Sequence, residues 1–168
     1  INILTVKTAE GRAYEVDMRL WPSGKSGPVT IAFDRFANYQ QDQAWTWEHM
    51  ALVRARIITG FDHEDLANNI ETCLKTLFQM PRDNDKVIRE AHDMRQRITI
   101  HHPPRSAHDL RLIPGGLIDI DFFAQVMQLL NPRSDGRRFG KAIDAITDLG
   151  VRRIITAKDK KALKTSIT

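Results

Sequence analysis

The sequence predicts a mainly α-helical chain that opens with a β-hairpin, and three observations support this class. Residues 3–20 fit a β-hairpin with Gly11 in its turn, and its second arm, residues 14–20, alternates between apolar and polar side chains. From about Phe33 onward, apolar residues recur at the three- and four-residue spacing of helices. Glycine, proline and asparagine interrupt that pattern and divide it into separate helices. The 168 residues are enough for a sizeable core.

The hairpin is predicted mainly from its second arm, residues 14–20, where polar and apolar side chains alternate strictly. Its polar face carries Glu15, Asp17 and Arg19. Gly11 can adopt the positive φ that the turn needs. Because a lone hairpin is not stable in water, we expect it to extend a sheet or to lie on the helices.

Helices are predicted in the remainder of the chain from apolar spacing and from the residues that begin and end each one. Asp62 is the expected N-cap of a helix that ends at Pro81, and residues 103–114 are expected to be irregular. The other predicted helices cover 33–42, 45–58, 83–101, 117–130, 139–149 and 156–166.

Composition and charge limit the classes of protein that fit. No apolar run approaches the roughly 20 residues of a membrane span, so no membrane partner is expected. The single cysteine excludes an internal disulfide and favours a cytoplasmic location. The net charge of +4 is compatible with a phosphate-bearing ligand or an acidic partner. Because the chain lacks a starting methionine, we expect it to begin inside a longer protein.

Two segments near the front offer candidate chemistry, although each also has an ordinary interpretation. A strand acid beside a flexible loop could help to hold Mg²⁺, which prefers oxygen ligands, but an exposed strand with solvated charges explains the same pattern. The loop 22–28 contains two glycines, two serines and Lys25, which could approach a phosphate, yet an ordinary turn is as good an explanation. The candidate phosphate-binding residues are Arg19, Ser23 and Lys25.

Two helices carry polar residues that need partners. In helix 45–58, Arg54 falls within a wide apolar arc, while Arg56 lies on the other side with Glu48 beside it. In helix 117–130, Asp119 falls on the apolar side and Asp121 on the polar side. We predict that Asp119 or Asp121 pairs with an arginine of helix 45–58 and locks the helices to the sheet.

Three segments, in this order and spacing, resemble glutamine synthetase adenylyltransferase, the bifunctional adenylylating and adenylyl-removing enzyme of bacterial nitrogen control. They are 14–27 (YEVDMRLWPSGKSG), 44–56 (AWTWEHMALVRAR) and 115–122 (GGLIDIDF). The resemblance covers most of residues 8–130. The amino-acid sequences of the last two segments are more similar to the C-terminal, adenylylating half of the enzyme than to its N-terminal half.

The resemblance implies a nucleotidyltransferase of the DNA-polymerase-β type followed by a helical bundle. Residues 1–42 would be the end of the nucleotidyltransferase domain and 43–168 the bundle. Asp17 matches the third of three carboxylates that hold two Mg²⁺ ions, which makes it the expected catalytic and metal-binding residue. The implied reaction transfers AMP from ATP to a tyrosine of glutamine synthetase, with a PII-type signal protein as a further partner and no nucleic acid.

Three departures from the family pattern qualify this prediction. No Gly-Ser…Asp-x-Asp motif stands upstream of Asp17, so the chain is predicted not to transfer AMP by itself. The family usually has arginine where Trp21 stands, and Asp121 replaces the usual glutamate.

The alternative to an enzyme fragment is a non-catalytic helical module that uses its basic C-terminal third to dock an acidic protein or nucleic acid.

Overall fold

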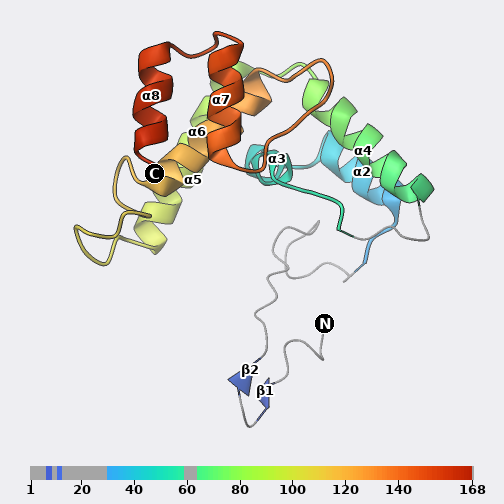
Figure 1. Cartoon of the computed structure of the whole chain (residues 1–168). Helices are drawn as coiled ribbons and strands as arrows, with labels where there is room; N and C mark the ends of the chain where they lie inside the picture. Colours follow the sequence, from blue (N-terminus) through green and yellow to red (C-terminus); the bar gives the residue numbers. More distant parts are fainter. Residues whose placement is uncertain (1–6, 9–10, 13–29, 59–63, 168) are drawn as a thin grey trace.

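The computed structural model of the chain describes residues 7–8, 11–12, 30–58 and 64–167 (Figure 1). Seven α-helices account for most of these residues, so the predicted mainly α-helical class is confirmed. None of the helices in the described ranges combines the length and the apolar character that a bilayer crossing requires.

A short antiparallel pairing lies nearest the N-terminus. Strand β1 (Lys7–Thr8) pairs with β2 (Gly11–Arg12), with Lys7 opposite Arg12 and Thr8 opposite Gly11. Gly11 has a φ of +115°, the positive value predicted for the turn. The predicted second arm, 14–20, and the loop 22–28 lie outside the described residues. The origin of this hairpin in a nucleotidyltransferase sheet therefore stays a prediction.

Helices α2 (Phe33–Asp42) and α3 (Thr46–Val53) follow, and only α3 departs from its predicted range. The apolar pattern predicted a helix over 45–58, and this C-terminal boundary is wrong. After Val53 the amides of Arg54 and Ala55 donate to carbonyl oxygens three residues back, at 3.1 and 2.9 Å. Such bonds tighten the last turn and end the helix.

The next three helices keep their predicted positions: α4 (Glu64–Gln79), α5 (Asn84–His101) and α6 (Leu117–Leu130). The N-cap of α5 is Asp83, whose side chain accepts a hydrogen bond from the Lys86 amide at 3.0 Å. The N-cap predicted for α4, Asp62, lies outside the described residues.

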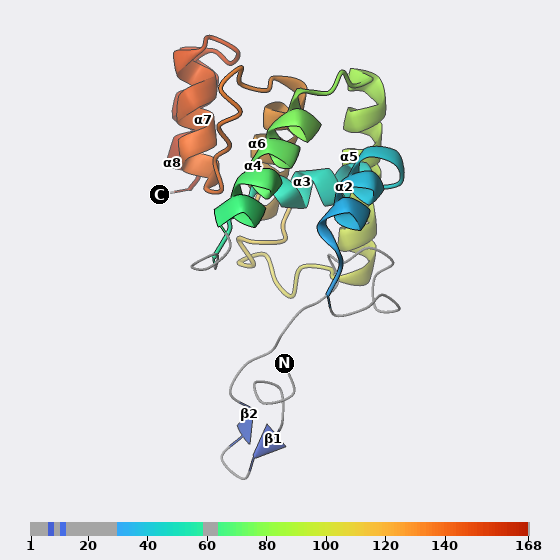
Figure 2. The same cartoon turned by 90° about the vertical axis from the view of Figure 1, so that its right-hand side faces the viewer.

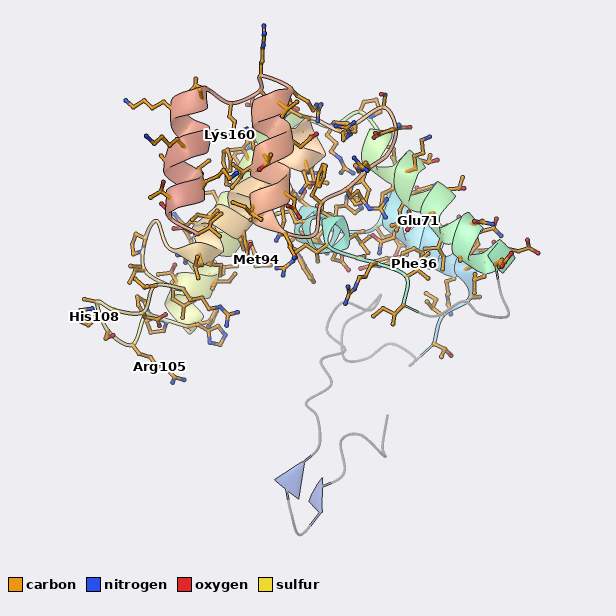
Figure 3. All side chains as sticks on the ribbon, viewed as in Figure 1. Phe36, Glu71, Met94, Arg105, His108 and Lys160 are labelled. Carbon is orange, nitrogen blue, oxygen red and sulfur yellow. The ribbon has the colours of Figure 1, made fainter. Side chains whose placement is uncertain are left out.

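Helix α7 (Ala142–Val151) begins later than the predicted residue 139, and the cause is a contact with α6. The Gln128 side chain accepts from the Phe139 amide at 2.8 Å and donates to the Phe139 carbonyl at 3.2 Å. These bonds occupy the Phe139 backbone, so the helix starts beyond it. Helix α8 (Ala157–Thr165) lies beside α7 (Figure 1), and its Lys160 extends toward α7 (Figure 3) over Gly150.

The helices pack around α3 and α6. Helix α3 lies in the middle of the array in Figure 2 and contacts α5 and α6, while α6 also contacts α5 and α7. The main core draws on four helices. Its buried members are Met50, Val53, Leu74, Leu77, Phe78, Val87, Ala91 and Leu129. Each large apolar side chain buried this way stabilises the fold by about 1.5–3 kcal/mol.

The loop before α6 shows why two glycines precede that helix. Gly115 has a φ of +77°, and a Cβ added to Gly116 would lie 2.5 Å from the Leu110 carbonyl oxygen and 2.8 Å from that of Ile113. The backbone of the preceding loop therefore leaves no room for a side chain at position 116. The Leu117 amide donates to the same Leu110 oxygen at 2.9 Å, which ties the loop to the start of α6.

Candidate functional site

The residues predicted to bind nucleotide and metal are Asp17, Arg19, Ser23 and Lys25, and all four lie outside the described residues. Trp21 lies outside them as well. Within the described part of the chain, no group of three His, Cys, Asp or Glu side chains is placed to hold a metal ion. The roles of these residues therefore stay predictions. The described helices position a different set of polar side chains.

The first half of α3 contains a buried polar centre. Glu48 is 4% exposed, and both of its carboxylate oxygens accept from the Tyr39 hydroxyl, at 2.9 and 3.0 Å. One of the two also accepts from the Trp45 amide at 2.9 Å, which caps the start of the helix. The polar side of α3 is thus turned inward, against α2, rather than toward solvent.

His49 links three elements through both of its ring nitrogens. Nε2 lies 2.9 Å from the Gln40 carbonyl oxygen, and Nδ1 lies 2.9 Å from Nη1 of Arg82. A carbonyl can only accept and a guanidinium can only donate, so the ring is neutral with its proton on Nε2. Nη2 of Arg82 donates to the Leu77 carbonyl at 3.0 Å, which joins the end of α4 to the centre.

Burial lowers the pKa of His49, the charge of Arg82 lowers it further, and the hydrogen bond to Gln40 opposes both. In the unfolded chain the imidazole binds a proton near its ordinary pKa of about 6.5, whereas folded His49 stays neutral to lower pH. The contribution of His49 to stability is therefore complete above pH 6.5. It is lost as the pH falls from there toward the lowered folded pKa.

The variant His49→Gln tests this dependence, since an amide can still donate to the Gln40 carbonyl but does not titrate. We expect the unfolding free energy of the wild-type chain to fall more steeply between pH 7.5 and 5.5 than that of the variant. Each unit by which the folded pKa is lowered corresponds to about 1.4 kcal/mol. Urea unfolding at both pH values measures the difference, and equal slopes would contradict the assignment.

The two aspartates of α6 pair with different arginines, Arg54 just after α3 and Arg95 of α5. Oδ2 of Asp121 lies 3.7 Å from Nη1 of Arg54, so one of the predicted pairings with the 45–58 segment is present. Both side chains are about half exposed, and such a pair contributes little to stability. Asp119 instead pairs with Arg95 of α5 and accepts from the Gly115 amide at 2.6 Å. Arg56 lies beyond the end of α3 and is exposed.

Several basic residues of the last third are used in internal contacts. Arg133 pairs with Asp135 and Asp148, which raises the pKa of the guanidinium and lowers that of the Asp135 carboxyl. Nη2 of Arg138 lies 3.0 Å from the Glu71 carboxylate of α4, and Figure 3 labels Glu71 on that helix. These pairs reduce the positive charge left for a partner. The alternative of a basic docking module stays a prediction.

Sequence reasoning missed the partners that complete the buried centre. Gln40, Arg82 and Tyr39 were not singled out, although Glu48 was recognised as a polar residue of the 45–58 segment, which has a wide apolar arc. That polar group beside an apolar arc was the available signal. It showed that partners were required but not which residues supply them, because the nearest is nine residues away and Arg82 is 33 away.

Comparisons with known proteins define the family. Residues 1–98 match the family model described as glutamate-ammonia ligase adenylyltransferase, and residues 86–168 match that of GlnD PII-uridylyltransferase. Bifunctional glutamine synthetase adenylyltransferase/adenylyl-removing enzymes are similar over much of the chain. Those of Mesorhizobium japonicum and Rhizobium meliloti are each 46% identical, over 82% and 79% of this chain. That of Agrobacterium fabrum is 42% identical over 87%.

Both matched family models are named for nucleotidyltransferases, so the helical array belongs to proteins of that class. More narrowly, the chain belongs to the glutamate-ammonia ligase adenylyltransferase family, as the resemblance of its three motifs predicted. The chain spans only 13–15% of the length of these three relatives.

Proposed function

We propose that the chain is part of an ATP-dependent enzyme that transfers AMP to a tyrosine of glutamine synthetase. The match of residues 1–98 to the adenylyltransferase family carries this proposal, because that range includes the motif 14–27 with Asp17. The names of the relatives support glutamine synthetase as the protein substrate. A PII-type signal protein as regulator and a cytoplasmic location belong to the same proposal.

In the proposed reaction the tyrosine hydroxyl oxygen attacks the α-phosphorus of ATP. A new oxygen–phosphorus bond forms, the bond to pyrophosphate breaks, and the hydroxyl proton passes to solvent. Asp17 provides a carboxylate ligand, and Arg19, Ser23 and Lys25 contact the phosphates. Two Mg²⁺ ions, when bound, supply charge neutralisation at the attacking and leaving oxygens.

The helices have a supporting role in this proposal. Residues 1–42 are the end of a nucleotidyltransferase domain of the polymerase-β type, and 43–168 form a helical bundle that backs it, as in the C-terminal, adenylylating half of the family. The hydrogen bonds that the Tyr39 hydroxyl donates to Glu48 and that His49 donates to the Gln40 carbonyl support a firm attachment between the two parts. The Arg54–Asp121 pair then joins α3 to α6 within the bundle.

The experiment compares the purified 168-residue chain with a longer family protein that contains it and a Gly-Ser…Asp-x-Asp motif. We expect the longer protein to label glutamine synthetase from ATP whose α-phosphate is radioactive, and the 168-residue chain to give no label above background. A mixture of the longer protein and the 168-residue chain is the control for inhibitors, and it should still label glutamine synthetase. Clear turnover by the 168-residue chain would refute its predicted inactivity, and no label from the longer protein would refute the reaction.

A further inference from the structure

The loop between α5 and α6, residues 102–116, projects from one end of the helical array (Figure 3). Leu110 of this loop is 66% exposed, Ile100 in the last turn of α5 is 74% exposed, and Leu117 at the start of α6 is 41% exposed. Single exposed apolar side chains are ordinary, whereas several at one place mark a surface that another body covers. The proposed reaction assigns no role to this loop.

The loop is tied to both of its helices, which keeps Leu110 beside the start of α6. The Leu110 carbonyl oxygen accepts from the Leu117 amide at 2.9 Å. Nη2 of Arg95, on α5, donates to the Leu112 carbonyl at 3.0 Å. A surface that is already ordered loses little conformational entropy when a partner binds, so these exposed side chains are prepared for contact.

The same loop presents positive charge that no ion pair with the described residues neutralises. Arg105 and Arg111 are exposed, and neither side chain has a hydrogen bond or an ion pair within the described part of the chain. The one acid among residues 102–116 is Asp109, whose carboxylate accepts from the Arg105 and Leu112 amides, each at 3.3 Å. The surface therefore combines aliphatic side chains with two guanidinium groups, and its complement is an acidic surface that also carries apolar groups.

Two other kinds of partner fit this surface less well. A second copy of the chain, joined about a two-fold axis, would bring Arg105 and Arg111 of both copies together and set like charges against each other. Nucleic acid would meet the arginines but not the aliphatic side chains, because phosphates offer no apolar contact. Residues 100–117 also contain no Phe, Tyr or Trp on which bases stack.

The length of the family members indicates where a protein partner lies. The chain spans only 13–15% of the length of its relatives, so most of a family member lies outside it. Interfaces between domains of one polypeptide are more polar than obligate interfaces between subunits, which fits the mixed character of this loop. Covalent connection also raises the effective concentration of the partner, so a few apolar and charged contacts are sufficient.

We propose that residues 100–117 form a docking surface for another domain of the longer family protein, whose contacting face is acidic and aliphatic. Leu110 and Leu117 pack against apolar side chains of that domain, while Arg105 and Arg111 pair with its carboxylates. The docking does not require that AMP transfer occurs, and it therefore goes beyond the proposed function.

A cysteine placed in the loop reports whether the surface is covered. Ala107 is exposed and lies between the two arginines in the sequence, so Ala107→Cys adds a thiol and keeps the proposed contacts. N-ethylmaleimide should label that thiol about tenfold or more slowly in a longer family protein that contains the chain than in the 168-residue chain, because docked domains must open first. Mass spectrometry of the peptide with position 107 distinguishes this label from any on Cys73.

Two further substitutions test which side chains hold the domain. In the longer protein, Leu110→Ser and Arg111→Glu should each raise the labelling rate at position 107 by about fivefold or more, as expected for the loss of an interfacial contact. The matched controls are Ile88→Ser, which removes an exposed apolar side chain near the start of α5, and Lys158→Glu, which reverses an exposed charge on α8. Both controls should leave the rate unchanged, and in the 168-residue chain all four substitutions should leave labelling fast.

Equal labelling rates in the two proteins would overturn the proposal. Slow labelling in the longer protein that neither Leu110→Ser nor Arg111→Glu relieves would also overturn it, because something other than these contacts would then cover the loop. If the rate in the longer protein falls only when a DNA duplex is added, the partner is nucleic acid and the proposal is again wrong. None of these readouts depends on whether AMP is transferred.

Discussion

Replacement of Asp17 by asparagine in a longer family protein is expected to lower the rate of AMP transfer by about a thousandfold or more. Asparagine keeps the size of the side chain but removes the negative charge that a Mg²⁺ ligand provides. A metal that neutralises charge in the transition state supplies several kcal/mol, and 4 kcal/mol is about a thousandfold in rate. The rate of AMP incorporation into glutamine synthetase, measured over a range of Mg²⁺ concentrations, tests this result.

Glu15→Gln is the matched control for Asp17→Asn. Glu15 lies two residues away and is predicted on the same face of the strand, so its replacement removes the same charge without removing the proposed ligand. We expect this variant to keep its rate within about threefold. Full activity in Asp17→Asn, or equal losses in both variants, would show that Asp17 has no special role. The predicted two-metal site would then need another third ligand.

The second large effect concerns stability and the start of α6. Gly116→Ala should lower the unfolding free energy by about 2–3 kcal/mol, because the new Cβ would lie 2.5 and 2.8 Å from two carbonyl oxygens. These atoms belong to the backbone and cannot rotate away as a flexible side chain could. The Leu110 oxygen also accepts from the Leu117 amide, so moving it weakens the hydrogen bond at the first turn.

Urea unfolding of Gly116→Ala should be compared with that of Gly140→Ala. A Cβ at Gly140 would meet its nearest atom, the Arg54 carbonyl oxygen, at 3.7 Å, an ordinary contact. We expect the Gly140 variant to stay within about 0.5 kcal/mol of the wild-type chain. If the two variants are equally stable, the loop before α6 has room to adjust, and the close approach of its backbone is not what requires glycine at position 116.

The predicted helix boundaries were accurate where the sequence pattern marks the ends of a helix, and less accurate where it does not. Helices α2 and α6 were predicted with their observed bounds from apolar periodicity, and the ends of α6 are also marked by Gly116 and by Asn131-Pro132. The segment 45–58 was predicted too long because apolar residues continue to Ile58 without any terminating residue. The start of α7 was misplaced because the side chain of Gln128, on another helix, binds the backbone of Phe139.

The sequence by itself determined the helical class, the family and the position of Asp17 within a recognisable motif. These depend on residues that are close together in the chain, where spacing and local propensity carry the information. Only the tertiary structure decided that Arg95, and not Arg54 or Arg56, pairs with Asp119, and that the Glu48 carboxylate is buried against the Tyr39 hydroxyl of α2. Partners from separate helices are set by how the helices pack, and periodicity within one helix does not specify that packing.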